Sequence, residues 1–374
     1  MNSRERVIKT LNHESADRPP MDLGGAASGL NDVAYFNLKK YLNIEGDIAP
    51  FRSGTTVNYY DERILDKLEI DFRRLILKKT DKFPMYFGDG SFVNEWGIKY
   101  IKKGEYFETS GNPLANADVD EIKSFAWPKA QEVFDASGLK EKAKEMYENT
   151  GYALVARMPC WGLFDLAFQM RGMERFMMEM LTEPDTAHLI VEKILESEMD
   201  FYTMLLDSVG EYVQMVETCD DLGSQKGLLF SIKTFRNIIK PSRTKLNRLI
   251  KEKAPRAKIF MHSCGAIFNL IPDIIETGVD VLNPLQPNAA GMDPEAIKQT
   301  YGKSLSFHGC IDTQIALRGS VEDTQNEVRK KVGVLYKDGG YIVAPANHIM
   351  SDVPMENIVA LYATAKNFKT VEVG

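Results

Sequence analysis

The chain of 374 residues is long enough to bury a large core, either as one elaborated domain or as two. Its hydrophobic content of 44% and charged content of 26% are ordinary for a soluble globular protein and exclude collagen-like, disordered and coiled-coil sequence. A net charge of -7 argues against nucleic acid and anionic membranes as partners, because both attract clustered lysine and arginine.

The amino-terminal segment 1–20 is charged and helix-periodic, without the apolar stretch of a signal peptide or anchor. No segment approaches the roughly 18–20 apolar residues of a membrane span. The four cysteines are too few and too widely spaced for a disulfide scaffold, so we expect reduced thiols. These features predict a cytoplasmic protein that does not enter a membrane.

Short apolar runs alternate with longer amphipathic stretches along the chain, and eight of these runs are typical of buried strands. They cover residues 18–25, 72–79, 152–159, 212–221, 257–265, 279–286, 304–312 and 340–348. A helical pattern over 320–339 opens with Ser320 as N-cap and Asp323 at the third helical position. Eight strand-then-helix units predict an α/β fold, the (β/α)8 TIM barrel, because parallel strands need long crossovers.

A doubly wound open sheet is the rival fold, and it usually carries a glycine-rich phosphate turn after its first strand. The segment "DLGGAASG" at 22–29 lacks the required G-x-G-x-x-G spacing. Residues 83–128 interrupt the alternation between the second and third strands. We expect one or two β-hairpins there, turning at 88–90 and 103–104, followed by a capped helix. This insertion would act as a lid on a single domain covering 1–374, or mediate a homodimer.

Residues able to carry chemistry follow the predicted strands, at the end of a barrel where active sites lie. His262 and Cys264 are separated by one residue, so in an extended strand both side chains point to the same side. A catalytic zinc takes three protein ligands and keeps one position open, so this pair needs a further donor. Cys310 and His348, after the seventh and eighth strands, are the candidates for it.

Other residues at these strand ends carry weaker predictions. Glu217, Asp220 and Asp221 form either a solvated acidic turn, a support for a metal-bound histidine, or an acid-base group. We expect Asp22 and Asn347 to contact substrate. His308 is expected to pack or hydrogen-bond in the core, because it lies two residues before Cys310 and only one of the two needs to face the centre.

Four segments of the chain resemble the uroporphyrinogen decarboxylase superfamily, specifically its methyltransferase branch. They are "SRERVIKTLNHESADRPPMDLGG", "MHSCGAI", "FHGCIDTQ" and "GGYIVAPANHIMSDVPMENIVAL", and they cover the chain in order. The resemblance implies a (β/α)8 fold and zinc-dependent methyl transfer involving cobalamin, a corrinoid carried on a separate small protein.

Two departures from the family pattern bear on substrate and metal. True uroporphyrinogen decarboxylases carry an arginine-rich element after the first strand, whereas this chain has no arginine between Arg18 and Arg52. This disfavours a tetra-acid porphyrinogen and favours a neutral or aromatic ligand. Members acting on thiol acceptors have a second cysteine where this chain has Ala346, Asn347 and His348. The third ligand is therefore His348 or Cys310, or the site is a two-residue remnant.

The function predicted from these features is a zinc-dependent methyltransferase. It would move a methyl group between a small methylated substrate, such as an O-methyl ether, and the corrinoid of a partner protein, with Glu217 or Asp220 as the proton partner. One alternative is a metal-independent decarboxylase-like lyase with Asp22 or Asp221 as the polarising group. Another is a non-catalytic corrinoid- or ligand-binding barrel.

Overall fold

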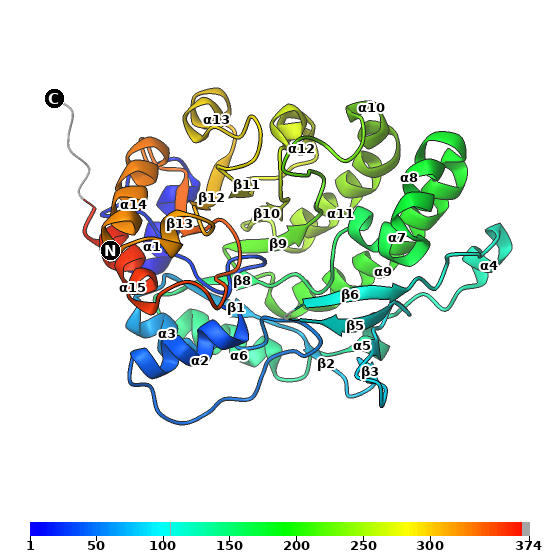
Figure 1. Ribbon diagram of the computed structural model, residues 1–374, viewed down its shortest axis with the longest axis horizontal. Helices are drawn as coiled ribbons and strands as arrows, with labels where there is room; N and C mark the ends of the chain where they lie inside the picture. The colour runs from blue at the N-terminus through cyan, green and yellow to red at the C-terminus, as the bar shows by residue number, and fades with distance from the viewer. Residues whose placement is uncertain (105, 369–374) are drawn as a thin grey trace.

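A curved parallel sheet forms the centre of the protein in a computed structural model that describes residues 1–104 and 106–368 (Figure 1). Its seven strands are hydrogen-bonded in the order in which they occur along the chain. They are β1 (Phe72–Leu75), β8 (Ala153–Ala156), β9 (Met215–Cys219), β10 (Lys258–His262), β11 (Val281–Leu285), β12 (Ser306–Ile311) and β13 (Tyr341–Pro345). The predicted (β/α)8 TIM-barrel class is confirmed.

The eighth predicted strand is reduced to a short extended segment around Met21. Met21 forms a parallel bridge with Val343 of β13, supported by hydrogen bonds from the Asp22 amide to the Val343 carbonyl and from the Val343 amide to the Pro20 carbonyl. On its other side, the Met21 carbonyl accepts a hydrogen bond from the Asp71 amide, immediately before β1. This segment therefore joins the two edges of the sheet.

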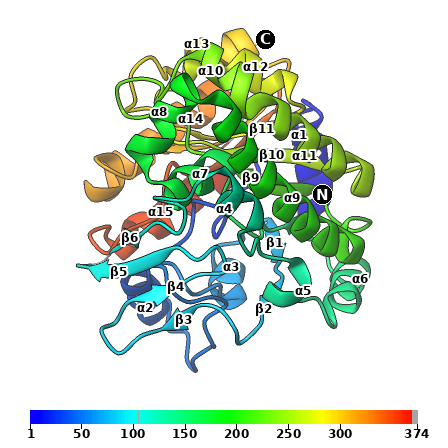
Figure 2. The same ribbon diagram turned by 90° about the vertical axis from the view of Figure 1, so that its right-hand side faces the viewer.

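Helices pack around the outside of the sheet, between successive strands (Figures 1 and 2). On the amino-terminal side they are α1 (Ser3–Leu11), α2 (Asp32–Tyr41), α3 (Glu62–Lys67), α5 (Ala130–Val133) and α6 (Leu139–Asn149). After β8 come α7 (Leu163–Arg171), α8 (Met173–Thr182), α9 (Pro184–Val209), α10 (Ile232–Thr234), α11 (Lys240–Lys253), α12 (Ile271–Glu276), α13 (Pro294–Tyr301), α14 (Val321–Leu335) and α15 (Met355–Lys366).

Local sequence explains where several helices begin. Ser320 caps α14 as predicted, because its side chain accepts a hydrogen bond from the Asp323 amide while the Asp323 carboxylate accepts one from the Ser320 amide. The methionine-rich helical pattern over 172–210 divides into α8 and α9 at Glu183, immediately before Pro184, which starts α9 at a position where proline is tolerated.

The segment 83–128 departs from the βα alternation as predicted. It forms a separate four-stranded antiparallel sheet from β3 (Met85–Tyr86), β4 (Phe92–Val93), β5 (Lys99–Lys103) and β6 (Tyr106–Gly111), followed by α4 (Val119–Ser124). Asp118 and Glu121 form a capping box at the start of α4. A two-stranded sheet of β2 (Lys78–Lys79) and β7 (Phe134–Asp135) flanks it. The lid, dimerisation and single-domain assignments stay predictions.

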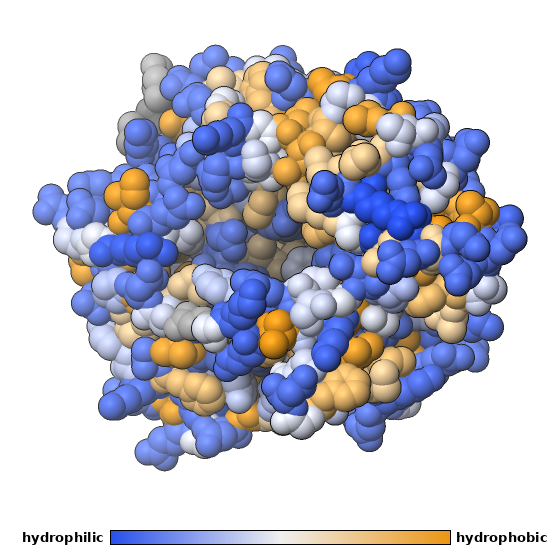
Figure 3. All heavy atoms as spheres, turned by 45° about the vertical axis from the view of Figure 1, so that its right-hand side comes forward, coloured by the Kyte–Doolittle hydropathy of each residue, from blue (hydrophilic) through white to orange (hydrophobic). Residues whose placement is uncertain are grey.

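The barrel strands are buried along their full length except for Lys258 at the start of β10, which is half-buried. This burial explains why the strands lack the apolar–polar alternation of a half-exposed sheet, and the polar residues that they contain are buried as well. Within the described ranges, none of the helices combines the length and apolar character needed to cross a bilayer. The side of the molecule that Figure 3 turns forward is hollowed near its centre.

Candidate metal centre at the barrel mouth

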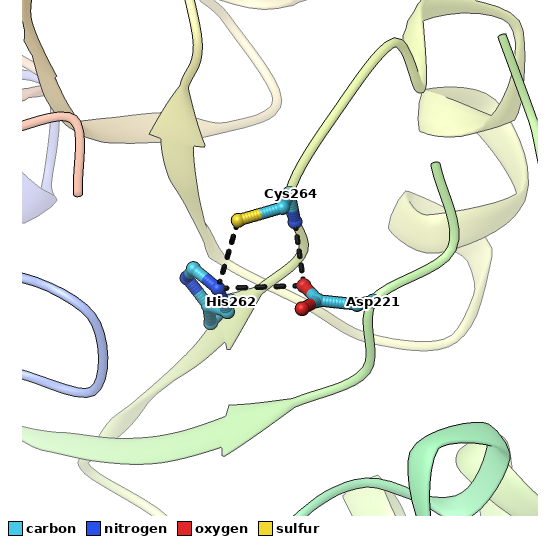
Figure 4. A group of neighbouring side chains, drawn as sticks. All are labelled: Asp221, His262 and Cys264. Carbon is cyan, nitrogen blue, oxygen red and sulfur yellow. Dashed lines mark hydrogen bonds and ion pairs between the residues drawn. The ribbon is translucent and has the colours of Figure 1, made fainter. Parts of the chain in front are cut away.

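Three side chains from two neighbouring strand ends converge beyond β9 and β10 (Figure 4). The imidazole Nε2 of His262 lies 3.3 Å from Cys264 Sγ and 3.4 Å from Asp221 Oδ1. One potential ligand atom from each residue lies within 4.8 Å of the other two. His262 is buried, and Cys264 and Asp221 are half-buried, so the group is accessible from one side.

The backbone brings these residues together through strand register and one glycine. His262 pairs with Cys219 across β9 and β10, which places the residues that follow each strand side by side. Gly265 has a φ of +88° and packs so closely that an added Cβ would lie 2.5 Å from the Gly223 backbone. Only glycine fits this approach, and it allows the Cys264 amide to donate a 2.8 Å hydrogen bond to Asp221 Oδ1.

The spacing of these atoms fits a zinc ion. Ligands about 2.0–2.3 Å from zinc and set at tetrahedral angles lie roughly 3.3–3.7 Å apart, which is the separation of Nε2 from its two neighbours. The set of one imidazole, one thiolate and one carboxylate is composed of donors that zinc accepts, and it leaves a fourth position open. The group is therefore compatible with zinc.

The electrostatics of the group concentrate charge around His262. Burial alone would lower the pKa of His262, but Cys264 and Asp221 outweigh it and hold that pKa well above its usual value. Burial acts in the opposite direction on Asp221, and its pKa stays below the usual value because His262 and the Cys264 amide favour the carboxylate. Asp221 is thus a carboxylate anion that faces the cationic imidazole of His262. The same carboxylate would also attract a metal cation.

A chain of buried hydrogen bonds extends from His262 across the barrel interior. His262 Nδ1 donates to Asn283 Oδ1 at 2.6 Å, and Asn283 Nδ2 donates to His308 Nδ1 at 2.7 Å. His308 Nε2 then donates to Asp22 Oδ2 at 2.8 Å. The Arg74 guanidinium binds both oxygens of Asp22, at 2.8 and 2.5 Å. We call Asn283, His308, Asp22 and Arg74 the support chain.

The support chain determines which nitrogen of His262 faces the open site. Burial would raise the pKa of Asp22, but Arg74 and His308 outweigh it and hold that pKa well below its usual value, so Asp22 only accepts hydrogen bonds. His308 therefore donates to Asp22 from Nε2 and accepts from the Asn283 amide through Nδ1. The Asn283 oxygen then accepts from His262, so His262 carries a proton on Nδ1. Its Nε2 faces Cys264 and Asp221 and holds the second proton of the cationic ring, and this is the nitrogen at which a metal ion would replace that proton.

The other two predicted metal ligands lie elsewhere. Among the described residues, the group that could hold a metal contains neither Cys310 nor His348. Cys310 is fully buried, and burial raises its pKa to about 12, with the charges of Lys331 and Glu327 on α14 as further influences. Gly309 and Cys310 have φ values of +96° and +74°, which break the strand alternation, so Cys310 and His308 do not share a face.

His348 lies at the barrel mouth but is hydrogen-bonded to the backbone. Its Nδ1 accepts a 3.0 Å hydrogen bond from the Gly29 amide. Burial lowers its pKa to about 3, and the positive charges of Arg52, His262 and Arg157 contribute to this shift. Asn347, predicted to contact substrate, lies beside the metal group, with its Nδ2 3.8 Å from Cys264 Sγ.

The remaining acidic residues have partners that account for their positions. Asp220 Oδ1 accepts from the amides of Phe164 and Asp165 at the start of α7, and its Oδ2 lies 2.7 Å from Arg243. Asp22 is fully buried in the support chain. Glu217 is fully buried and binds Arg74 through Oε1 at 3.0 Å. Of the three predicted acid-base candidates, only Asp221 reaches the metal group.

Sequence reasoning missed two features of this site. It assigned Asp221 an acid-base or supporting role rather than that of a potential ligand, and it did not mention Asn283 as a contact of His262. Asn283 pairs directly with His262 across β10 and β11. A polar residue inside the otherwise apolar run 281–285 is the signal that could have identified it. His308 is buried and hydrogen-bonded, as predicted.

Comparisons with known proteins place the chain in a family. The model of uroporphyrinogen decarboxylase (URO-D) matches residues 107–368, well over half of the chain. A search of the curated proteins finds no match. Among solved structures, a methyltransferase from Methanosarcina mazei shares 16% identity with a TM-score of 0.65, covering 98% of each chain.

Two further structures share less of the fold. A B12-independent methionine synthase from Shewanella sp. W3-18-1 has 9% identity and a TM-score of 0.45, covering 94% of this chain and 97% of its own. The xylanase 10B of Thermotoga maritima has 13% identity and a TM-score of 0.41, covering 62% of this chain and 80% of its own. The family match, which spans the strand ends carrying His262 and Cys264, shows that this chain belongs to the uroporphyrinogen decarboxylase family.

Proposed function

We propose that the protein is a zinc-dependent methyltransferase that exchanges a methyl group between a small methylated substrate and the corrinoid of a partner protein. The observation that carries this proposal is the convergence of His262, Cys264 and Asp221 where β9 and β10 end, with Asp221 and Cys264 partly exposed. Similarity in fold to the Methanosarcina mazei methyltransferase over the whole chain supports the reaction class.

In this proposal His262 Nε2, Cys264 Sγ and an oxygen of Asp221 hold the metal. Bound there, zinc would supply Lewis-acid chemistry at the heteroatom that carries the methyl group, which makes that group a better leaving group. The support chain keeps His262 Nε2 directed at the site, and Asn347 lies close enough to Cys264 Sγ to contact a substrate there.

The proton needed by the departing heteroatom comes from solvent or from a residue at the mouth. Glu217 and Asp220 were the sequence candidates for this role, but both are fully buried and ion-paired. Asp165, which is also buried but has no arginine or lysine partner among the described residues, is the better candidate, because burial and the nearby charges of Asp221 and Asp220 raise its pKa well above the usual value and favour the protonated acid. Its Oδ2 accepts from the Asp221 amide at 3.2 Å.

Two measurements on the purified protein test the proposal. Elemental analysis should find about one zinc per chain, and a methyl aryl ether with reduced cobalamin should yield methylcobalamin, followed by its absorbance change. Chelation of the metal and Cys264→Ala should each abolish the transfer. Methyl transfer at the same rate after complete removal of zinc would contradict the metal-dependent mechanism. Zinc binding without methyl transfer to any corrinoid would contradict the reaction class.

A further inference from the structure

Two arginine side chains meet at the barrel mouth without an acidic partner. Arg157, which follows β8, is only 4% exposed, and its Nη1 donates to the Gly24 carbonyl at 2.9 Å. Arg52, in the loop between α2 and α3, donates from Nε to the Val57 carbonyl at 2.7 Å. The Phe51 ring lies close to both guanidinium groups, with its centre 5.0 Å from that of Arg52 and 5.1 Å from that of Arg157.

The carboxylates near Arg52 and Arg157 bind other residues. Glu217 binds Arg74 through Oε1, while its Oε2 has no hydrogen-bond partner, so neither arginine of the pair reaches it. Asp32 accepts hydrogen bonds from the backbone and side-chain nitrogens of Asn58. Within residues 1–104 and 106–368, no carboxylate forms a salt bridge with Arg52 or Arg157.

The electrostatic cost of two arginines without an acidic partner is reflected in their pKa values. Burial lowers the pKa of Arg52 to about 9, with the charge of Arg157 acting in the same direction. Burial also lowers the pKa of Arg157, and Glu217 offsets this only in part. Arg157 is buried and Arg52 half-buried, and charges withdrawn from water without an acidic partner are costly, so this arrangement favours a ligand that neutralises them.

A cavity of about 130 Å³ adjoins both arginines. Lys79 also lines it, but that ammonium group is neutralised by Glu95 at 2.7 Å. Much of the remaining lining is apolar or aromatic, including Leu77, Met158 and Trp161. The cavity therefore offers an unpaired cationic side and an apolar side to the same ligand.

Contacts link this cavity to the metal group. The charges of Arg52, His262 and Arg157 all lower the pKa of His348, so the arginine pair and the metal group act on the same imidazole. Its neighbour Asn347 contacts Cys264 Sγ. Cys160, which lines the cavity, accepts through its carbonyl a 3.9 Å hydrogen bond from Cys219 Sγ, two residues before Asp221.

We propose that Arg52 and Arg157 bind a carboxylate of the substrate, so that the methyl donor is a small methylated carboxylic acid with an apolar or aromatic body. This inference rests on the proposed function, because it assigns the substrate class of the same site. The sequence favoured a neutral or aromatic ligand because no arginine follows the first strand. The fold supplies two arginines from other loops instead.

Binding of matched acids and amides to the zinc-loaded protein tests the proposal. The probes are 4-methoxybenzoate and methoxyacetate, each compared with its neutral amide, by calorimetry without any corrinoid. At least one acid should bind more tightly than its amide by about tenfold or more, as expected for hydrogen bonds to a charged group. Arg157→Gln and Arg52→Gln should each remove this preference.

Arg256→Gln is the matched control, because Arg256 also donates to a backbone carbonyl, that of Glu211, but lines a different cavity. It should leave the acid preference intact. The proposal would be overturned by equal binding of acids and amides or by no binding of either acid. It would also be overturned if the preference for the acid survived both Arg157→Gln and Arg52→Gln. Acid binding through Arg52 and Arg157 without methyl transfer would sustain it and contradict the proposed reaction instead.

Discussion

At the scale of single residues, the central feature is a trio of donor atoms contributed by two neighbouring strand ends. His262 is the last residue of β10, Cys264 follows that strand, and Asp221 follows β9. Each residue of the trio has a further contact that orients it: Asn283 for His262, Asn347 for Cys264, and the Cys264 amide for Asp221. Metal affinity should therefore depend on these residues and not on other cysteines of the barrel.

Replacing Cys264 with alanine should remove zinc from the purified protein, because only two donors would remain at the site. Cys310→Ala is the matched control: it deletes a thiol of the next-but-one strand that faces α14. It should keep about one zinc per chain. Loss of zinc from Cys310→Ala with retention in Cys264→Ala, measured by elemental analysis, would reverse the ligand assignment.

Asn283→Leu should weaken zinc binding by about 10–100-fold, the usual effect of losing the residue that orients a metal-bound histidine. Competition with a chromogenic chelator measures the dissociation constant. Asn247→Leu removes a comparably buried amide, bonded to Thr277, and should leave the zinc affinity unchanged. Equal zinc affinity in Asn283→Leu and the parent protein would show that the support chain does not hold His262 for the metal.

At the scale of secondary-structure elements, buried ion pairs fix helices relative to one another. Arg171 at the end of α7 binds Glu179 of α8 at 2.6 Å, and both side chains are buried. Arg175 binds the same carboxylate at 2.9 Å. Burial alone would raise the pKa of Glu179, but the two arginines outweigh it and hold that pKa below its usual value.

A carboxylate with a lowered pKa stabilises the folded state above its unfolded pKa, and this contribution is lost as pH falls through the folded pKa. Glu179→Gln should therefore lower the free energy of unfolding by about 2 kcal/mol at pH 7, because it leaves a buried arginine with a weaker partner. Below about pH 4 the difference from the parent should shrink. Urea denaturation at both pH values measures it, and a constant difference would contradict the assignment.

At the scale of the whole molecule, the barrel does not depend on the metal group for its core. Apolar side chains from the strands and surrounding helices form a large buried cluster and a second, smaller one, whereas His262, Cys264 and Asp221 lie where β9 and β10 end. A ligand that binds only the folded state stabilises it by mass action, by about 4 kcal/mol at a thousand times its dissociation constant.

Zinc should accordingly raise the melting temperature, and chelation should lower it, while the far-UV circular dichroism at 25 °C stays the same. Cys264→Ala should melt at the same temperature with and without zinc. Differential scanning calorimetry measures both. A loss of helical signal on chelation would mean that the metal organises the barrel itself, contrary to its position at the strand ends.

Much of the barrel can be predicted from local patterns in the amino-acid sequence. Seven of the eight apolar runs contain barrel strands, and the eighth, around Met21, bridges to Val343. Apolar runs and caps are local signals, because burial of a strand and satisfaction of a helix terminus depend on neighbouring residues. The His262 and Cys264 pair was identifiable for a similar reason, since the two residues stand one apart at the end of an apolar run.

Contacts between residues far apart in the sequence could be identified only from the folded structure. Asp221 approaches Cys264 because Gly265 permits close backbone packing, and Cys310 leaves the barrel interior because two successive residues have positive φ. Neither follows from strand periodicity. Arg52 and Arg157 are 105 positions apart in the printed sequence, and their pairing at one cavity depends on how two loops close over the mouth. Composition and periodicity specified the barrel and two of the three donors of the metal group, whereas long-range packing added the third donor and brought Arg52 and Arg157 to the same mouth.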